Sequence, residues 1–376
     1  MMVNKTVWSL SCVCFSLSTL LSLVGIISVI QLYFNVSIYY ASLYASIFAG
    51  TLGFSSLILP AIFSRFEKKK LIMVILLITA ACNLMELFIS DYFIGLFFRI
   101  VPAFFYPIAV SSALTVVGKI APNDTNKVVF GISAGSILGL SITSYLGFNF
   151  GYQVTMLWFV LINVFALVLT IMFIPNFEGN KEPIILQISH AKSKLFLFSI
   201  LYVFCMVGGI SITYNYIPTF LDQVTKINGE MLFITLFLMG LSSMFGTTLC
   251  GHLIHKNANW TVLLYPIGFS IITFVLGTFI NYPFAEMCIL LIFGIFDGSA
   301  YTVSQYWVTS SVRQSPEFAN GIFLLMCNLG IFIGTMVGGI IIDEINIVYI
   351  FFGSVIMMLL SVPFVLIRIK TMPDVV

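Results

Sequence analysis

Long apolar runs recur along the whole chain and are separated by short polar segments. A helix needs roughly 20 apolar residues to cross about 30 Å of hydrocarbon. A membrane barrel would show shorter segments that alternate apolar and polar residues, and these runs are continuously apolar. The pattern therefore predicts an all-α integral membrane protein with twelve spans. They are 8–32, 40–62, 71–90, 92–118, 128–150, 153–174, 195–220, 230–254, 261–280, 283–311, 319–342 and 345–367.

The longest polar break, 175–194, lies near the middle of the chain with six predicted spans on each side. We therefore expect an N-terminal six-helix bundle at 1–174, a cytoplasmic loop at 175–194 and a C-terminal six-helix bundle at 195–376. A weak internal repeat supports two pseudo-symmetric halves. "APNDTNKVVFGISAGSILG" before and into the fifth span parallels "SPEFANGIFLLMCNLGIFIG" before and into the eleventh.

Composition agrees with this pattern, because 60% of the 376 residues are hydrophobic and only 8% are charged. An average soluble domain has about a quarter of its residues charged. The polar tail "MMVNKT" is too short for a cleaved signal peptide, so we expect the first span to remain as an anchor.

Basic residues sort to one side of the predicted spans, and the cytoplasmic side of a membrane protein retains Lys and Arg. Fourteen of the sixteen lie in the tails or in alternate loops, Lys226 lies on the opposite side, and Arg99 lies inside a span. We therefore place both termini in the cytoplasm and the protein in a plasma membrane, bacterial or archaeal. The net charge of +2 follows from this sorting and indicates no nucleic-acid partner.

Three ionisable residues lie well inside predicted spans: Glu86, Arg99 and Asp297. Such groups cost about 2.5 to 3.5 kcal/mol at a helix centre on the insertion scale, so they usually face a cavity or a partner. Glu86 is the weakest of the three, because it lies one turn from the outer end of its span and could reach the interface. Four other acidic residues lie close enough to the outer surface to be solvated: Asp91, Glu286, Asp343 and Glu344.

Arg99 stays charged in proteins, so it can act only as a fixed positive charge. It could be the counter-ion of Asp297 or Glu86, bind an anionic substrate group, or donate to backbone carbonyls. It could also simply tie two helix ends together. Tyr106 follows seven residues later on the same helical face and is a candidate substrate contact.

Asp297 heads a polar stripe, because Tyr301, Ser304 and Gln305 follow at i+4, i+7 and i+8. In a membrane helix such a stripe lines a site or forms a packing seam with a neighbouring helix. With an aspartate at its head we favour the cavity lining, with Asp297 as the proton-coupling acid.

Other polar residues in spans are candidate substrate contacts. The seventh span ends in "SITYNYIPTFL", where Tyr214 and Tyr216 flank Asn215. These tyrosines fit either an interfacial belt or a cavity mouth at a helix broken before Pro218. In the eleventh span Asn328 stands among glycines at small-xxx-small spacing and could bond between helices or contact substrate.

Enzyme signatures are missing from the sequence: it has no phosphate-binding Gly-rich loop and no nucleophile elbow. His252 and His255 have no third ligand nearby, so we expect no metal site. We predict no enzymatic activity and no cofactor, and expect the proton gradient to be the energy source.

Several segments resemble the major facilitator superfamily, in particular its arabinose-efflux-permease-like drug and sugar efflux branch. They are the basic loop "FSRFEKKKL", the fourth-span "FFRIV", the seventh-span end "TYNYIPTFLDQVTKING" and the eleventh-span "NLGIFIGTMVGGIIID". The resemblance implies the major facilitator fold and a role of Arg99 in proton coupling. It also implies gating loops between spans, at Arg65, Lys68 and Lys69 in the first half and at Gly251 and Lys256 in the second.

We therefore predict a monomeric proton-coupled secondary transporter that exports a small organic molecule by alternating access, with membrane lipid as its surroundings. Proton-driven uptake remains an alternative, because the fifth span "GSILGLSITSYLG" lacks the Gly-Pro pair of the family's antiporters. A membrane enzyme or a non-transporting receptor is the less favoured reading.

Overall fold

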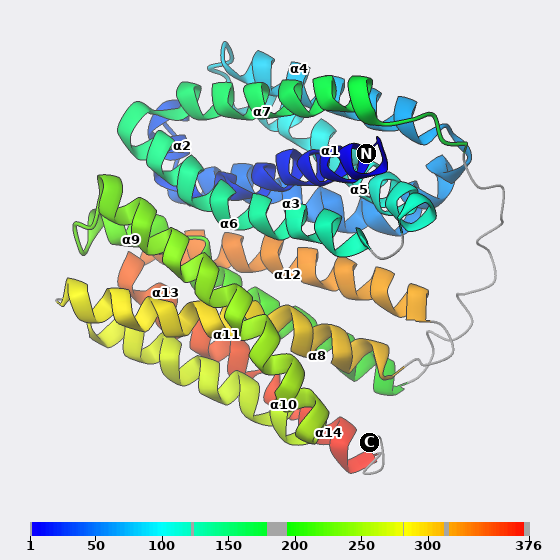
Figure 1. Cartoon of the computed structure of the whole chain (residues 1–376). Helices are drawn as coiled ribbons and strands as arrows, with labels where there is room; N and C mark the ends of the chain where they lie inside the picture. The colour runs from blue at the N-terminus through cyan, green and yellow to red at the C-terminus, as the bar shows by residue number, and fades with distance from the viewer. Residues whose placement is uncertain (1, 122–123, 179–193, 281, 312–315, 372–376) are drawn as a thin grey trace. The chain divides into compact units, whose positions relative to one another are not determined.

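The computed structural model describes residues 2–121, 124–178, 194–280, 282–311 and 316–371, and all regular secondary structure within them is helical. Contacts between Cα atoms divide the chain into two compact units. We call Met1–Val36 with Ile47–Pro183 the first bundle, and Ser37–Ser46 with Ile184–Val376 the second bundle (Figure 1). The predicted bundle boundaries stay a prediction, because most of the loop at 175–194 lies outside the described residues.

The first bundle is built from six predicted spans, in chain order from blue to green in Figure 1. α1 and η1 pack against α6, and α4 packs against both α5 and α7. The elements are α1 (Met2–Ser18), η1 (Thr19–Ile26), α2 (Ile27–Phe34), α3 (Ile38–Ile62), η2 (Phe63–Arg65), α4 (Lys68–Glu86), α5 (Tyr92–Ile120), α6 (Thr125–Phe150) and α7 (Tyr152–Phe173). The first residues of α3, up to Ser46, belong to the second bundle.

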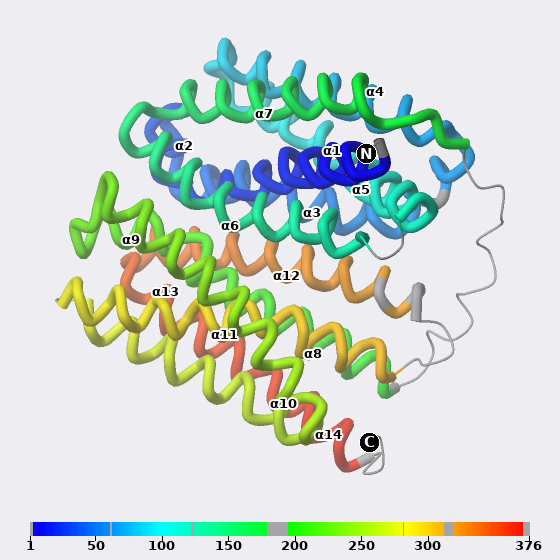
Figure 2. The backbone as a smooth tube through the Cα atoms, viewed as in Figure 1, coloured from blue at the N-terminus to red at the C-terminus, as the bar shows by residue number. Residues whose placement is uncertain are grey.

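The second bundle has α8 near its centre, in contact with α11, α12, α13 and α14. Its elements are α8 (Lys194–Tyr214), α9 (Ile217–Gln223), α10 (Gly229–Thr278), α11 (Pro283–Thr309), α12 (Pro316–Glu344), η5 (Ile347–Tyr349), α13 (Ile350–Leu359) and α14 (Val362–Thr371). α10 is two helices joined at Asn257, whose backbone is extended (φ −161°, ψ 96°), and the tube in Figure 2 turns back on itself there.

Ten helices of the described part are long and apolar enough to cross a membrane. With α10 counted as two and the shorter α4 included, all twelve predicted spans have a helix. α4 is not among the ten because it carries too many charges for its length. Its 19 residues begin with Lys68, Lys69 and Lys70 and end with Glu86.

Glycines of the internal repeat make equivalent contacts in the two bundles. A Cβ at Gly135 in α6 would lie 2.5 Å from the carbonyl oxygen of Phe15 in α1. A Cβ at Gly330 in α12, the repeat counterpart of Gly135, would lie 3.1 Å from the carbonyl oxygen of Phe204 in α8. In each bundle, therefore, the repeat glycine lets the fifth span lie against the first, which is what small residues do between membrane helices.

The first span departs from the prediction of one continuous helix, because η1 winds as a 3₁₀ helix between α1 and α2. Hydroxyl side chains compete for the backbone there: Thr19 Oγ1 donates to the Ser16 carbonyl at 2.6 Å, and Ser22 Oγ to the Thr19 carbonyl at 2.5 Å. Such side chain to backbone bonds bend helices and change their winding. A 3₁₀ stretch inside a helix often marks a functional position.

Candidate functional site

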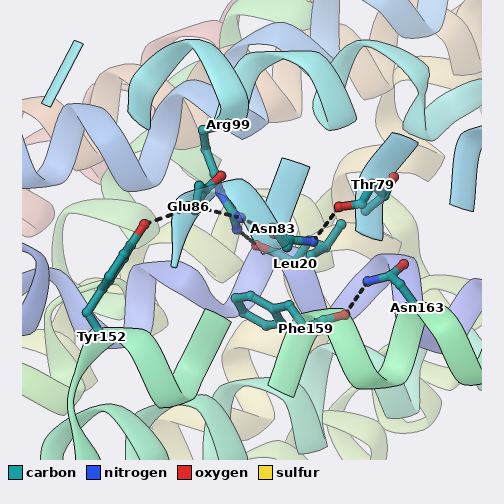
Figure 3. Close-up of polar contacts among 8 residues, drawn as sticks. All are labelled: Leu20, Thr79, Asn83, Glu86, Arg99, Tyr152, Phe159 and Asn163. Carbon is teal, nitrogen blue, oxygen red and sulfur yellow. Dashed lines mark hydrogen bonds and ion pairs between the residues drawn. The ribbon is translucent and has the colours of Figure 1, made fainter. Parts of the chain in front are cut away.

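The Arg99 guanidinium lies in the middle of the first bundle with no exposed surface (Figure 3). Its Nη1 donates to Asn83 Oδ1 at 3.2 Å, and its Nη2 donates to the carbonyl oxygen of Leu20 at 2.8 Å. Nη1 also lies 3.9 Å from Glu86 Oε2, so the two form a buried ion pair. Among the described residues, Nε has no hydrogen-bond partner. Arg99 thus joins α4, α5 and the 3₁₀ segment η1.

Glu86 has a second partner, because Tyr152 at the start of α7 donates its hydroxyl to Glu86 Oε2 at 2.9 Å. The Tyr152 ring in turn stacks on Tyr33 with centroids 4.4 Å apart. Glu86 is fully buried, so the expectation that it could reach the outer interface is wrong. The reason is its direction: on α4 it shares a face with Thr79 and Asn83, which are also fully buried.

Two aromatic rings complete the surroundings of the guanidinium. The Cζ of Arg99 lies 5.4 Å from the ring centroid of Phe48 and 5.5 Å from that of Phe159. A desolvated cation over a ring face gains about 2 kcal/mol. We call these groups together the Arg99 cluster: Arg99, Glu86, Asn83, Tyr152, Phe48, Phe159 and the Leu20 carbonyl.

Tyr106 lies next to this cluster and is 7% exposed. Its hydroxyl is 3.1 Å from Ser18 Oγ, and its ring meets Phe48 edge-on at 6.0 Å. Tyr106 and Arg99 therefore both contact Phe48 of α3, as their shared face of α5 suggested. Whether Tyr106 contacts a substrate stays a prediction.

In the second bundle, Asp297 lies half-buried near the middle of α11. The Ser243 hydroxyl of α10 is its hydrogen-bond partner. Tyr214 and Tyr265 lie near enough to interact with it electrostatically. Within the described residues it takes part in none of the ion pairs, so its pairing with Arg99 stays a prediction.

The rest of the predicted stripe divides between two environments. Tyr301 and Gln305 are exposed, whereas Ser304 is fully buried and its hydroxyl has no hydrogen-bond partner within the described residues. Tyr301 also meets Phe323 of α12 edge-on, with centroids 6.2 Å apart. Tyr301 and Gln305 are thus exposed, while Ser304 faces the interior of the bundle, and the role of all three in substrate binding stays a prediction.

The helix break expected before Pro218 is present, because α8 ends at Tyr214 and α9 begins at Ile217. Asn215, in the break, donates its side-chain amide to Thr335 Oγ1 of α12 at 2.5 Å. The Tyr216 hydroxyl donates to the Thr335 carbonyl at 2.6 Å, and Tyr216 is fully buried. An interfacial belt is therefore wrong for Tyr216, whose polar end bonds inside the bundle.

Tyr214 and Asn328, two further predicted contacts, lie in helices of the second bundle. Tyr214 is half-buried, and Asn328 is 8% exposed and donates to the Leu324 carbonyl one turn back at 2.8 Å. That bond stays within α12, so the interhelical bond expected for Asn328 is not among its described contacts. The role of both residues in substrate binding stays a prediction.

The four acids predicted to be solvated do not behave alike. Asp91 and Asp343 are exposed and cap helices: Asp91 Oδ1 accepts from the Ile94 N–H at 2.9 Å at the start of α5, and Asp343 accepts from two N–H groups at the start of α3. Glu344 is exposed as well. Glu286 is fully buried, so for this residue the expectation is wrong.

The predicted gating residues make local contacts where they are described. Lys68 Nζ donates to the Ser64 carbonyl at 2.9 Å, and Lys69 Nζ donates to the Ile171 carbonyl at the end of α7 at 3.0 Å. Of the other three, Arg65 and Lys256 are exposed, and a Cβ at Gly251 would have no neighbour within 4 Å. Their role in gating stays a prediction.

Sequence reasoning missed most partners of Arg99. Asn83 carried a usable signal, because Thr79, Asn83 and Glu86 form a polar stripe on α4 at helical spacing, as the residues after Asp297 do on α11. Tyr152 and Leu20 carried none. Leu20 acts through its backbone, and Tyr152 is 66 residues away from Glu86 in sequence.

Comparison with protein families gives one match that covers most of the chain. Residues 7–316 match the model of the Major Facilitator Superfamily. Among curated proteins, the chain is 22% identical over 310 residues to the uncharacterized MFS-type transporter YbcL of Bacillus subtilis, which covers 80% of this chain and 79% of the relative. It is 24% identical over 313 residues to a probable sugar efflux transporter of Helicobacter pylori, covering 81% of this chain and 80% of the relative.

Solved structures with the same fold cover essentially the whole chain. A crystal structure of a mutant of the nucleoside transporter NupG matches with a TM-score of 0.80 at 16% identity, covering 99% of this chain and 100% of that one. A bacterial homologue of the human lysosomal transporter Spinster matches with a TM-score of 0.75 at 13% identity, covering 100% and 98%. At such identities the likeness concerns the fold alone.

Proposed function

Because the chain belongs to the Major Facilitator Superfamily, and so is a multi-pass secondary transporter rather than an enzyme, we propose that it exports a small organic molecule in exchange for protons. Transporters of this kind carry a protonatable group that is exposed to one side of the membrane at a time. Asp297 is the proposed proton carrier, and Arg99 the fixed charge of the other bundle.

The observation that carries the proposal is the environment of Asp297. A half-buried carboxyl with a hydroxyl partner and, among the described residues, no ion pair can exist with or without its proton. Arg99 and Glu86 differ from it, because each already has an opposite charge within 3.9 Å. Asp297 is therefore better suited than Glu86 to exchange a proton in this conformation.

Arg99 has a role in the proposal that its contacts support. Its guanidinium bonds a side chain of α4 and a carbonyl of the 3₁₀ segment η1 at once. Because the guanidinium is rigid and planar, a change in the charge of Glu86 that moves Arg99 would also move its hydrogen bond to η1. We assign Arg99 the task of linking charge in the first bundle to the position of its first span.

The substrate class is proposed from polar side chains and from the relatives. The exposed side chains of Tyr301 and Gln305 carry a hydroxyl and an amide, groups that can bond the hydroxyls of a neutral polyhydroxy compound. The Helicobacter pylori relative is named a probable sugar efflux transporter. Neutral sugars are therefore the first substrates to test, and the name of this relative favours export as the direction to test first.

The test uses radiolabelled monosaccharides in membrane vesicles of both orientations. Export predicts that an acidic lumen drives accumulation in inside-out vesicles, and uptake predicts that an acidic bath drives it in right-side-out vesicles. Asp297→Asn should abolish the response to the pH gradient but keep counterflow, and the exposed control Glu344→Gln should keep both. An unchanged pH response in Asp297→Asn would overturn the proposal for this residue.

A further inference from the structure

Glu286 is a buried acid that the proposed mechanism does not use. It lies in the first turn of α11 and has no exposed surface. Neither of its carboxylate oxygens has a hydrogen-bond partner within the described part of the chain. Glu86, the other fully buried glutamate of the described residues, has both an arginine and a tyrosine hydroxyl beside it. Glu286 is thus a buried acid without the partners that normally hold a carboxylate.

Because Glu286 is buried without polar partners, the bundle accommodates its neutral form better than its ionised form. Moving an ionised carboxylate into an apolar site without compensation is far more costly than moving the neutral acid, so such a group takes up a proton instead. Glu286 takes part in none of the ion pairs found among the described residues. The described conformation therefore suits Glu286 with its proton bound.

Glu286 also extends the Asp297 stripe toward the start of α11. Leu290, Phe293 and Asp297 follow it at i+4, i+7 and i+11, so all four share one helical face. That face packs on α10, because Gly294 lies against Ser242 and Asp297 bonds to Ser243. Eleven residues of helix separate the two acids by about 16 Å along the axis.

The side chains between the two acids are apolar and fully packed. Leu290 is 1% exposed and Phe293 is 0% exposed, and Phe293 meets Phe269 with centroids 4.9 Å apart. This apolar packing separates the two acids along the helix.

A cavity of about 380 Å³ is lined by residues that adjoin Glu286 in the sequence, although the fully buried Glu286 is not itself one of its lining residues. Pro283 and Met287, which are three residues before and one after Glu286, line it together with Lys226 and Asn228. The charged groups on the elements around this turn are Lys226 and Glu230, which are exposed, and Asp222 in α9, which is half-buried.

We propose that Glu286 is a second proton-binding site of the transporter, at the start of α11, which exchanges protons through this cavity and precedes Asp297 on the same helical face. The inference rests on the proposed proton coupling. It differs from that proposal in the residue concerned, and so its failure can be told apart from a failure at Asp297.

The test measures bound protons directly, with the proton as the only ligand. Infrared difference spectra of the purified full-length protein, recorded between acidic and alkaline buffer, report the carbonyl stretch of each acid that loses its proton. We expect Glu286→Gln to remove one such band, and the exposed control Glu230→Gln to leave the buried-acid bands unchanged. Glu286→Asp keeps an acid at the site and should shift the band in frequency.

The outcomes separate the two proposals. A Glu286→Gln spectrum that superimposes on that of the unaltered protein overturns the second site. Loss of a band in Glu286→Gln but not in Asp297→Asn supports Glu286 and removes Asp297 as a carrier. Size-exclusion profiles establish that each variant is folded, and if Glu286→Gln fails this check, the frequency shift in Glu286→Asp decides, with an unshifted band counting against the proposal.

Discussion

The buried ion pair between Arg99 and Glu86 predicts that losing one charge is more harmful than losing both. Glu86→Gln keeps the shape of the side chain but leaves Arg99 without a carboxylate at 3.9 Å. At that separation and an effective dielectric constant near 20, the lost attraction is about 4 kcal/mol. This agrees with the roughly 3 to 5 kcal/mol measured when one partner of a buried pair is removed.

Replacing both partners has a different expected result, because Glu86→Leu with Arg99→Met removes the two desolvated charges together. Such replacements are often neutral or stabilising. The free energy of unfolding, measured by detergent denaturation in mixed micelles, should fall by about 3 to 5 kcal/mol in Glu86→Gln and by much less in the double variant. Glu178→Gln, an exposed acid of the same bundle, is the control. Equal loss in Glu86→Gln and the double variant would refute the reasoning.

Three smaller changes test other contacts of the two bundles. Tyr152→Phe removes the hydroxyl that Glu86 Oε2 accepts at 2.9 Å, so we expect a loss of about 1 to 3 kcal/mol in the same denaturation assay, smaller than for Glu86→Gln. Asp343→Ala removes the side chain that accepts two N–H groups at the start of α3, and it should cost about 1 kcal/mol and speed hydrogen exchange of those amides. Arg368→Lys keeps the charge but loses the planar group that stacks on Trp307 at 3.8 Å, so thermal stability in detergent should fall, by an amount equivalent to about 1 to 2 kcal/mol. An unchanged value in any of the three would show that the contact does not stabilise the protein.

The helices could be predicted from sequence because each span is a long apolar run, and every predicted span has a helix in the structure. The winding of the first span could not, since it depends on where the hydroxyls of Thr19 and Ser22 bond. Any serine or threonine in a helix is able to make such a bond, and sequence does not say which of them changes the winding.

The candidate site was predicted in part. Arg99 and Glu86 were identified because a buried charge is unusual in a span, and their pairing was one of the alternatives considered. The position of Glu286 was misjudged because only its distance from the helix end was considered. Its spacing from Leu290 and Phe293 places it on the packed face, so helical direction outweighs distance from the end.

Coupling between proton and substrate is the central claim, and simultaneous measurement of both fluxes tests it most directly. The protein is reconstituted into sealed liposomes with a pH-sensitive dye inside, and a gradient of a transported sugar is imposed without a pH gradient. Exchange predicts that sugar moving out of the lumen drives protons into it, so that the lumen acidifies, and that Asp297→Asn moves sugar without acidification. A lumen that stays at constant pH or becomes alkaline while sugar leaves would contradict the account.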